Sequence, residues 1–95
     1  MNPLIWASMS NHIEVVKYLI SNGVNIDARD KGGSTALIQA AFNDNVGIVE
    51  CLISAGADKD VRNIKGETAL SLAYGQTKQY LRSITGIDDY SDYSY

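Results

Sequence analysis

The sequence predicts an all-α fold, a short solenoid of stacked helix-turn-helix units with projecting hairpin loops. The first observation is an internal repeat. The segment 33–56 is matched at a spacing of 33 residues by residues 66–73 downstream and by residues 16–23 upstream. A fixed internal period of this size is typical of stacked repeats rather than of one globular core. The second observation is that apolar residues recur at helical spacing in these copies and stop at a glycine, Gly23 or Gly56.

The first unit opens with a helix start signal. Asn2 can cap a helix over about residues 3–9, because proline is well tolerated at the first helical position. Ser10 or Asn11 is expected to cap a second helix, and Glu14, three residues after Asn11, would complete a variant of the capping box. Four apolar residues then make one face of this second helix: Val15, Val16, Leu19 and Ile20.

The second unit repeats this plan after a polar linker. Residues 24–34 are rich in Asn, Asp and Gly, which predicts a projecting hairpin. Thr35 is expected to cap a helix that runs to about Phe42, and Asp44 or Asn45 is expected to cap the next helix. The same apolar face then returns: Ile48, Val49, Leu52 and Ile53. A second hairpin is expected in register with the first.

The third unit departs from the pattern. A helix is expected over residues 68–74, but residues 75–77 replace the longer approach to the helix that follows. Residues 80–84 match residues 51–55 only if about four residues are deleted. The last helix is therefore predicted to be abbreviated and to end near Gly86, as a capping repeat does.

These boundaries divide the chain into a repeat domain and a tail. The domain spans residues 1–86, with repeats at about 2–29, 30–62 and 63–86. Residues 87–95 are acidic, are rich in tyrosine and serine, and lack a helical or strand period, which predicts a flexible tail. Their hydroxyl groups are candidates for phosphorylation, with a plain solubilising end as the alternative.

Composition excludes several classes of function. The net charge of -3 and the pI near 4.8 argue against nucleic-acid binding, which needs excess Lys and Arg to neutralise phosphates. No apolar run approaches the roughly 20 residues that cross a bilayer, and the N-terminus lacks the pattern of a secretory signal. We therefore expect no membrane association and a cytoplasmic protein. The single cysteine, Cys51, agrees with a reducing compartment.

No constellation of residues predicts catalysis. His12 and Cys51 are the only histidine and cysteine. Cys51 corresponds by the repeat to Tyr18, which lies roughly 9 Å along a helix from His12, whereas a nucleophile and its base must lie within about 3 Å. A zinc site would need about four protein ligands of the Cys or His type. The Gly32-Gly33 pair lacks the Lys-Ser/Thr of a phosphate-binding loop. The chain is expected to be no enzyme and to hold no cofactor or metal.

Three copies in register resemble the ankyrin repeat. The segments T-A-L-I-Q-A-A (35–41) and T-A-L-S-L-A (68–73) are similar to the T-P-L-H-x-A-A signature of that family, and I-V-E-C-L-I-S-A-G-A-D (48–58) is similar to its second helix and turn. N-P-L-I-W-A (2–7) is a weaker copy that keeps the proline. The family's proline is Ala36 and Ala69 here, and its histidine is Ile5, Ile38 and Ser71. The loss of that histidine's hydrogen bonds predicts lower stability than is usual for the family, partly offset by burial of the isoleucines.

The resemblance implies that protein partners dock on a concave surface made by the hairpin tips and the exposed ends of the first helices. Carried over by position, the expected partner-binding residues are Met9, Arg29, Lys31, Ser34, Phe42, Asn43, Arg62, Ile64, Lys65 and Glu67, with Ser10, Gly32 and Gln76 beside them. Cationic and apolar side chains together predict a ligand with acidic and aromatic or aliphatic groups. Residues 87–95 have this composition, so the tail is expected to compete for the surface.

A second hypothesis is that the chain is a structural fragment or spacer of a longer ankyrin array, with no partner site of its own. The first repeat lacks a preceding hairpin, and exposure of Ile5, Trp6 and Val15 at this open end would favour that interpretation, since natural caps are polar on the outside. The open N-terminal repeat and the tail are also candidates for self-association.

Overall fold

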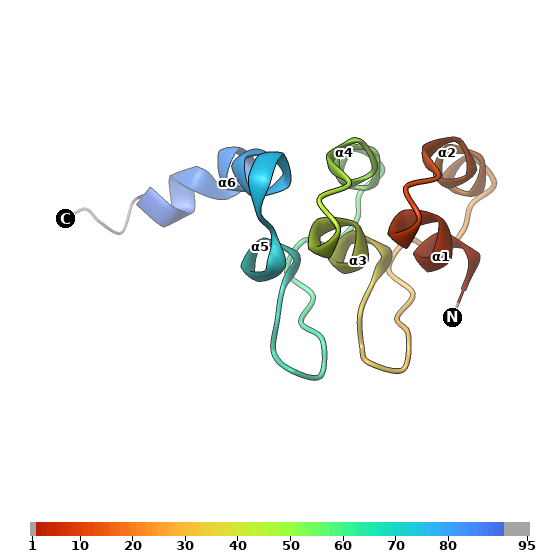
Figure 1. Cartoon of the computed structure of the whole chain (residues 1–95), viewed down its shortest axis with the longest axis horizontal. Coiled ribbons are helices and arrows are strands. Elements are labelled where there is room, and N and C mark those ends of the chain that lie inside the picture. Colours follow the sequence, from red (N-terminus) through yellow and green to blue (C-terminus); the bar gives the residue numbers. More distant parts are fainter. Residues whose placement is uncertain (1, 91–95) are drawn as a thin grey trace.

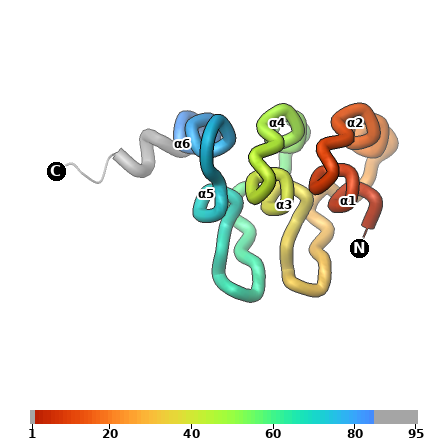
Figure 2. Tube along the Cα trace, in the orientation of Figure 1, coloured from red at the N-terminus to blue at the C-terminus, as the bar shows by residue number. Residues whose placement is uncertain are grey.

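Three helix pairs stand side by side in the computed structural model, which describes the backbone of residues 2–90 and the side chains of residues 2–84. The helices are α1 (Pro3–Met9), α2 (Ile13–Ser21), α3 (Ala36–Phe42), α4 (Val46–Ser54), α5 (Ala69–Leu72) and α6 (Gly75–Tyr90). The first helices of the pairs form one layer and the second helices form another, while two loops project on the side of the first helices (Figure 1). The chain trace passes through the pairs in sequence order (Figure 2). This is the predicted solenoid.

The first helix of each pair begins where its sequence predicts. The Asn2 side chain accepts a hydrogen bond from the Ile5 N–H at 2.8 Å, and Thr35 Oγ1 accepts one from the Ile38 N–H at 3.3 Å. Thr68 forms a reciprocal capping box with Ser71. Each cap satisfies a backbone donor that the helix itself leaves unpaired.

The core lies between the two helix layers and continues from pair to pair. Its largest fully buried apolar side chains are Leu4, Ile5, Val16, Leu37, Ile48, Val49, Leu52 and Leu81. Ile5 and Ile38, which replace the family's histidine, are both buried, so apolar packing fills those sites as expected. Val15, in contrast, is exposed, because it lies on the outer side of a helix that no further pair covers.

The N-cap of α4 is one of the two predicted candidates, Asn45, whereas the N-cap of α2 is His12 and not Ser10 or Asn11. Asn11 and Asp44 lie just before the helix starts, in the tight turns that join the two helices of a pair. Their backbones are in the left-handed region, at φ 60° and φ 54°. Asn and Asp tolerate this conformation better than other residues with a Cβ. The N-caps are His12 and Asn45, and neither side chain makes a capping hydrogen bond. The Asn45 amide instead donates to the Ser8 carbonyl oxygen of the preceding repeat at 2.7 Å.

The prediction of an abbreviated last helix was wrong, because the deletion falls elsewhere. The shortened element is α5, which has 4 residues, whereas α6 has 16 and continues past Gly86 to Tyr90. Gly75 takes the left-handed turn position at φ 57°, and the Asp44 carboxylate accepts a hydrogen bond from the Thr77 N–H at 3.0 Å. A cap supplied by the preceding repeat thus lets α6 start directly after the turn. The prediction for residues 91–95 lies outside the described residues.

The two projecting loops, hairpin 1 (residues 25–34) and hairpin 2 (residues 58–67), are built alike. The Asp30 carboxylate accepts hydrogen bonds from the Gly32 and Ser34 N–H groups, both at 2.9 Å, and the Asn63 side-chain oxygen plays the same part in hairpin 2. Gly33, at φ 78°, completes the turn of hairpin 1. Three hydrogen bonds join the hairpins: Ile64 N–H to the Gly32 carbonyl oxygen, Asp58 N–H to Asp27 Oδ1, and Arg29 Nη2 to the Arg62 carbonyl oxygen.

Candidate partner-binding surface

A groove runs between α3 and hairpin 2 on the side of the first helices. One hollow of about 220 Å³ is lined by Ser34, Ile38, Gln39, Phe42, Asn63, Lys65, Glu67 and Leu72. A second, of about 240 Å³, is lined by Asp30, Gly32, Ser34, Gln39, Asn63, Ile64, Lys65 and Glu67. Five residues line both hollows, so the two form one continuous surface, called the groove below.

The exposed end of each first helix carries a large apolar side chain. Met9 ends α1, Phe42 ends α3 with 56% of its surface exposed, and Tyr74 follows α5 with 53% exposed. Ile64, at the tip of hairpin 2, is 77% exposed. Large apolar side chains that are exposed next to one another are typical of a surface that binds another molecule. Sequence reasoning named Gln76, the equivalent of Ser10 and Asn43, in this repeat and missed Tyr74, because α5 ends at Leu72, earlier than the 33-residue register predicts.

The groove's acidic side chains are already used inside the molecule. Besides its two backbone donors, Asp30 receives a bond from the Gln39 amide at 3.5 Å. Glu67 Oε1 accepts a hydrogen bond from the Asn63 amide at 2.9 Å. Lys31 and Lys65, at the two hairpin tips, are exposed and make no side-chain hydrogen bond or ion pair with any described residue. Both carboxylates keep their negative charge, because their donors are neutral, but the two lysines are the charged groups of this surface that bond to no other described residue.

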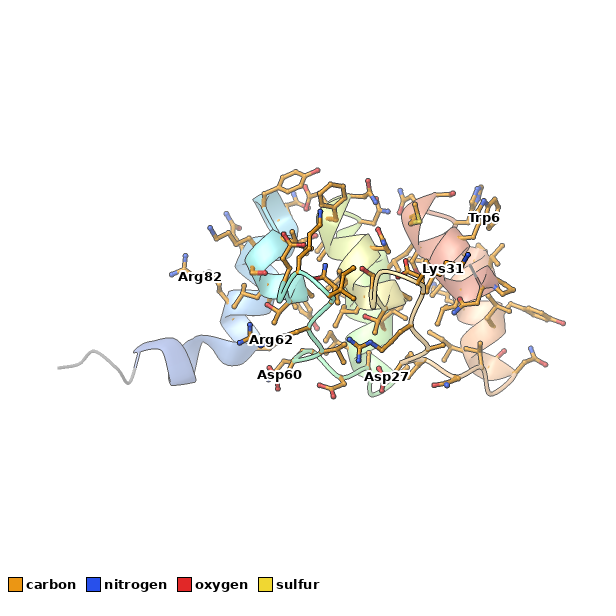
Figure 3. The ribbon with its side chains drawn as sticks, turned by 90° about the horizontal axis from the view of Figure 1, so that it is seen from below. Trp6, Asp27, Lys31, Asp60, Arg62 and Arg82 are labelled. Atoms are coloured by element: carbon orange, nitrogen blue, oxygen red, sulfur yellow. The ribbon has the colours of Figure 1, made fainter. Side chains whose placement is uncertain are left out.

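The two arginines among the predicted residues, Arg29 and Arg62, do not line the groove. Arg29 donates to the Gly33 carbonyl oxygen and to hairpin 2, and Arg62 donates to the Gly66 carbonyl oxygen at 2.9 Å. Seen from the hairpin side, Lys31 lies toward Trp6, whereas Arg62 lies toward the opposite edge (Figure 3). Arg29 thus joins hairpin 1 to hairpin 2, whereas the bond of Arg62 lies within hairpin 2.

Three further residues that were predicted to bind a partner differ in how exposed their side chains are. Ser34 lines the groove but is only 7% exposed, since its backbone is tied to Asp30. Asn43 is exposed, and its amide donates to the Gln39 carbonyl oxygen at 3.0 Å. Glu67 is half-buried. The structure thus brings together Lys65, Phe42, Ile64 and Glu67, and puts Met9 and Lys31 on the neighbouring repeat.

His12 and Cys51 lie in separate places. The His12 ring stacks on Trp6 with centroids 4.9 Å apart, whereas Cys51 is half-buried beside Lys17 and Ile20 in a hollow of about 360 Å³ between α2 and α4. Among the described residues, no three His, Cys, Asp or Glu side chains gather in a way that could hold a metal ion. In the same part of the chain, no helix is both long and apolar enough to cross a membrane.

Comparison with known proteins extends these observations. Residues 1–63 match the family model described as ankyrin repeats in three copies. A 37-residue stretch, 39% of the chain, is 49% identical to the ankyrin repeat protein RP714 of Rickettsia prowazekii (strain Madrid E) and spans 35% of it. The crystal structure of the ankyrin repeat domain of Bcl-3, described as a unique member of the IkappaB protein family, superposes with a TM-score of 0.82 at 32% identity. That match covers 85% of this chain and 36% of the other, so the chain spans about a third of each relative.

Proposed function

Since the chain belongs to the ankyrin repeat family, we propose that it is a non-catalytic protein-binding module whose groove accepts an extended segment with acidic and aromatic or aliphatic side chains. Ankyrin repeats generally mediate protein–protein interaction. One observation carries the finer proposal: apolar side chains at the ends of the first helices stand beside hairpin-tip lysines that bond to no other described residue.

The apolar side chains supply the anchors of the proposed interface. Phe42, Leu72 and Lys65 line the same hollow, so an apolar side chain placed in it loses part of its contact with water. Burial of such a group is worth about 25 cal/mol per Å² of apolar surface. Aromatic and aliphatic anchors near the centre of an interface dominate its energy, and the polar rim fixes orientation.

The two lysines determine which charge the partner should carry. Lys31 and Lys65 lie in the equivalent turns of hairpin 1 and hairpin 2, one position apart in the 33-residue register. A peptide laid across both repeats would therefore meet two positive groups, whereas the groove's carboxylates, Asp30 and Glu67, already accept hydrogen bonds inside the molecule. Exposed pairs of this kind contribute roughly 0.2–1 kcal/mol each and mainly speed and steer association.

A peptide with the sequence of residues 87–95, I-D-D-Y-S-D-Y-S-Y, is a suitable probe, because it combines the required groups. It is titrated, with NMR detection, into a chain shortened after Tyr90, which keeps all of α6. We expect shifts at Phe42, Lys65 and Tyr74. Versions with Asn for Asp or Ser for Tyr should bind more weakly.

Variants then separate groove binding from general attraction. Phe42→Ala is expected to weaken peptide binding about tenfold or more, the loss typical of an interface anchor. Lys31→Ala with Lys65→Ala should weaken it by a similar factor at low salt and by less at high salt. Lys17→Ala, which removes a cation on α2, is the matched control and should change nothing. Equal loss in the Lys17 variant would count against the groove, and absence of any shift would favour a spacer without a partner site.

A further inference from the structure

We propose that the groove selects a partner segment in the polyproline II conformation, with a large apolar side chain at every third residue and acidic side chains between them. This inference rests on the proposed function and adds the backbone conformation and the residue spacing of the partner. Three features of the molecule support it: the spacing of the exposed apolar side chains, the hydrogen bonds that fix this spacing, and the absence of a strand from residues 2–90.

The apolar anchors of the surface recur once per repeat. Met9, Phe42 and Tyr74 stand at the exposed ends of three first helices that pack side by side, α1 against α3 and α3 against α5 (Figure 1). The axes of packed helices lie about 8–10 Å apart, so consecutive anchors are separated by a similar distance. A partner that contacts all three anchors must therefore present an apolar side chain at this interval.

The polyproline II helix is the regular conformation that gives this interval in a short peptide. It has three residues per turn and rises about 3.1 Å per residue, so residues i, i+3 and i+6 lie on one face about 9 Å apart. A strand places side chains on one face at steps of about 6.6 Å and about 13 Å, which both miss the anchors. An α-helix reaches the next anchor only after seven residues, or about 10.5 Å, so a short helical peptide cannot fill three anchors.

The groove also offers no backbone edge with which a strand could pair. A peptide that binds as a strand depends on hydrogen bonds to the edge of a sheet, and residues 2–90 contain no strand. The backbone of the polyproline II helix is instead solvated and needs no such partner. Side chains such as Phe42, Leu72 and Lys65, which line one hollow, would supply the contacts.

Hydrogen bonds between repeats fix the spacing of the anchors. Asn45 donates to the Ser8 carbonyl oxygen, next to the first anchor, at 2.7 Å. Asp44 accepts a hydrogen bond from the Thr77 N–H, three residues after the third anchor, at 3.0 Å. Because Asp44 and Asn45 both closely follow Phe42, the turn behind the middle anchor is bonded to the segments beside both outer anchors. A row of anchors with fixed spacing favours one residue period in the partner, since any other period leaves an anchor unfilled.

One segment of the chain has the required period in its sequence. Residues 87–95 read I-D-D-Y-S-D-Y-S-Y, in which Ile87, Tyr90 and Tyr93 recur at every third position and Asp89 and Asp92 recur at the same period. A free peptide of this sequence in the polyproline II conformation would present an apolar row to the three anchors and two carboxylates to the two hairpin lysines. Within the chain, residues 87–90 belong to α6, so the period is tested in a separate peptide.

Two peptides of identical composition, both with blocked ends, test the spacing. The first is I-D-D-Y-S-D-Y-S-Y, and the second, I-D-Y-D-Y-D-Y-S-S, places the apolar residues at every second position. Each is titrated into the full chain up to about 5 mM, which covers weak affinities, while NMR follows the amide groups of Phe42, Lys65 and Tyr74. The first should bind at least about tenfold more tightly, because the second meets the middle anchor with an aspartate whenever it fills both outer ones.

A proline version of the first peptide tests the conformation. In I-D-D-Y-P-D-Y-S-Y, proline replaces a serine, so the carboxylates and the apolar side chains are all kept. Proline fits the polyproline II helix but removes an N–H that a paired strand or an α-helix uses. This peptide should bind at least as tightly as the first, because it loses less conformational freedom on binding. Binding that is weaker by about tenfold or more, the loss of a whole anchor, would overturn the proposal.

Variants of the chain locate the preference in the groove. Phe42→Ala should reduce the preference for the first peptide over the second, because the row of three anchors loses its middle member. Lys17→Ala, on α2, is the matched control and should leave the preference unchanged. A preference that persists undiminished in Phe42→Ala would overturn the proposal.

The titrations also separate this inference from the proposed function. If both peptides of identical composition shift the groove resonances with equal affinity, the spacing and the conformation are overturned and the proposed function stands. If neither peptide shifts them, both proposals are overturned.

Discussion

Two buried hydroxyl groups, Ser8 Oγ and Thr77 Oγ1, have no hydrogen-bond partner in the described structure. Thr77 takes the place of Ile48 in the shortened last repeat, and Ser8 takes the place of Ala41. An unpaired buried hydroxyl costs about 1–3 kcal/mol. Thr77→Val and Ser8→Ala are therefore expected to raise the free energy of unfolding, each by about 1 kcal/mol, in urea titrations. A loss of stability in either variant would show that its hydroxyl is paired in solution.

Gly75 is required at its position for two reasons. Its φ of 57° disfavours residues with a Cβ, and an added Cβ would lie 2.6 Å from Asp44 Oδ2, the carboxylate that caps α6. Gly75→Ala should therefore cost about 2–4 kcal/mol, the strain of the left-handed conformation plus a lost cap. Gly23, at φ 79° with nothing within 4 Å, is the matched control, and Gly23→Ala should cost only about 1 kcal/mol. If thermal unfolding shows the same loss of stability for Gly75→Ala and Gly23→Ala, the contact with Asp44 does not contribute to the effect at Gly75.

At the scale of elements, the hairpins stabilise the stack through backbone bonds that a proline can delete one at a time. Ile64 sits in hairpin 2 where Lys31 sits in hairpin 1, and its N–H donates to the Gly32 carbonyl oxygen at 2.9 Å. Ile64→Pro should lower the free energy of unfolding by about 1 kcal/mol more than Ile64→Ala, because only the proline removes this bond. Lys31→Pro, at the edge without an internal partner, should lower it no more than Lys31→Ala does. Similar effects at both sites in chemical denaturation would mean that the bond between hairpins contributes no net stability.

The elements also show which features a sequence can predict. The caps at Asn2, Thr35 and Thr68 depend on residues three apart, so a local pattern suffices to find them. The start of α6 depends on the Asp44 carboxylate, 33 residues before the N–H that it accepts. No local pattern contains that information, so the deletion was placed in the wrong helix.

The same limit applies to the candidate surface. Phe42, Lys65 and Ile64 were predicted correctly as surface residues, because the repeat fixes their place on the scaffold. The period alone could not show that Arg29 is used internally, since the acceptor of its second hydrogen bond is the carbonyl oxygen of Arg62, the equivalent residue of the next repeat. The repeat predicts where a side chain lies on the scaffold. Whether that side chain is free to bind a partner depends on the contacts between repeats.

At the scale of the whole molecule, stability should be greatest in the middle repeat. In a solenoid each repeat is stabilised only by its neighbours, so an end repeat has one stabilising interface and a middle repeat has two. Here α3 packs against both α1 and α5, and α4 packs against both α2 and α6. Amide groups of α3 and α4 should therefore exchange with deuterium more slowly than those of α2, by at least about tenfold after correction for intrinsic rates, which corresponds to about 1.4 kcal/mol of local opening energy. Leu4→Ala, which weakens only the first interface, should speed exchange in α1 and α2 far more than in α5. Equal rates in all helices would instead mean that three repeats unfold as one unit, and that the interfaces between them are stronger than the repeats themselves.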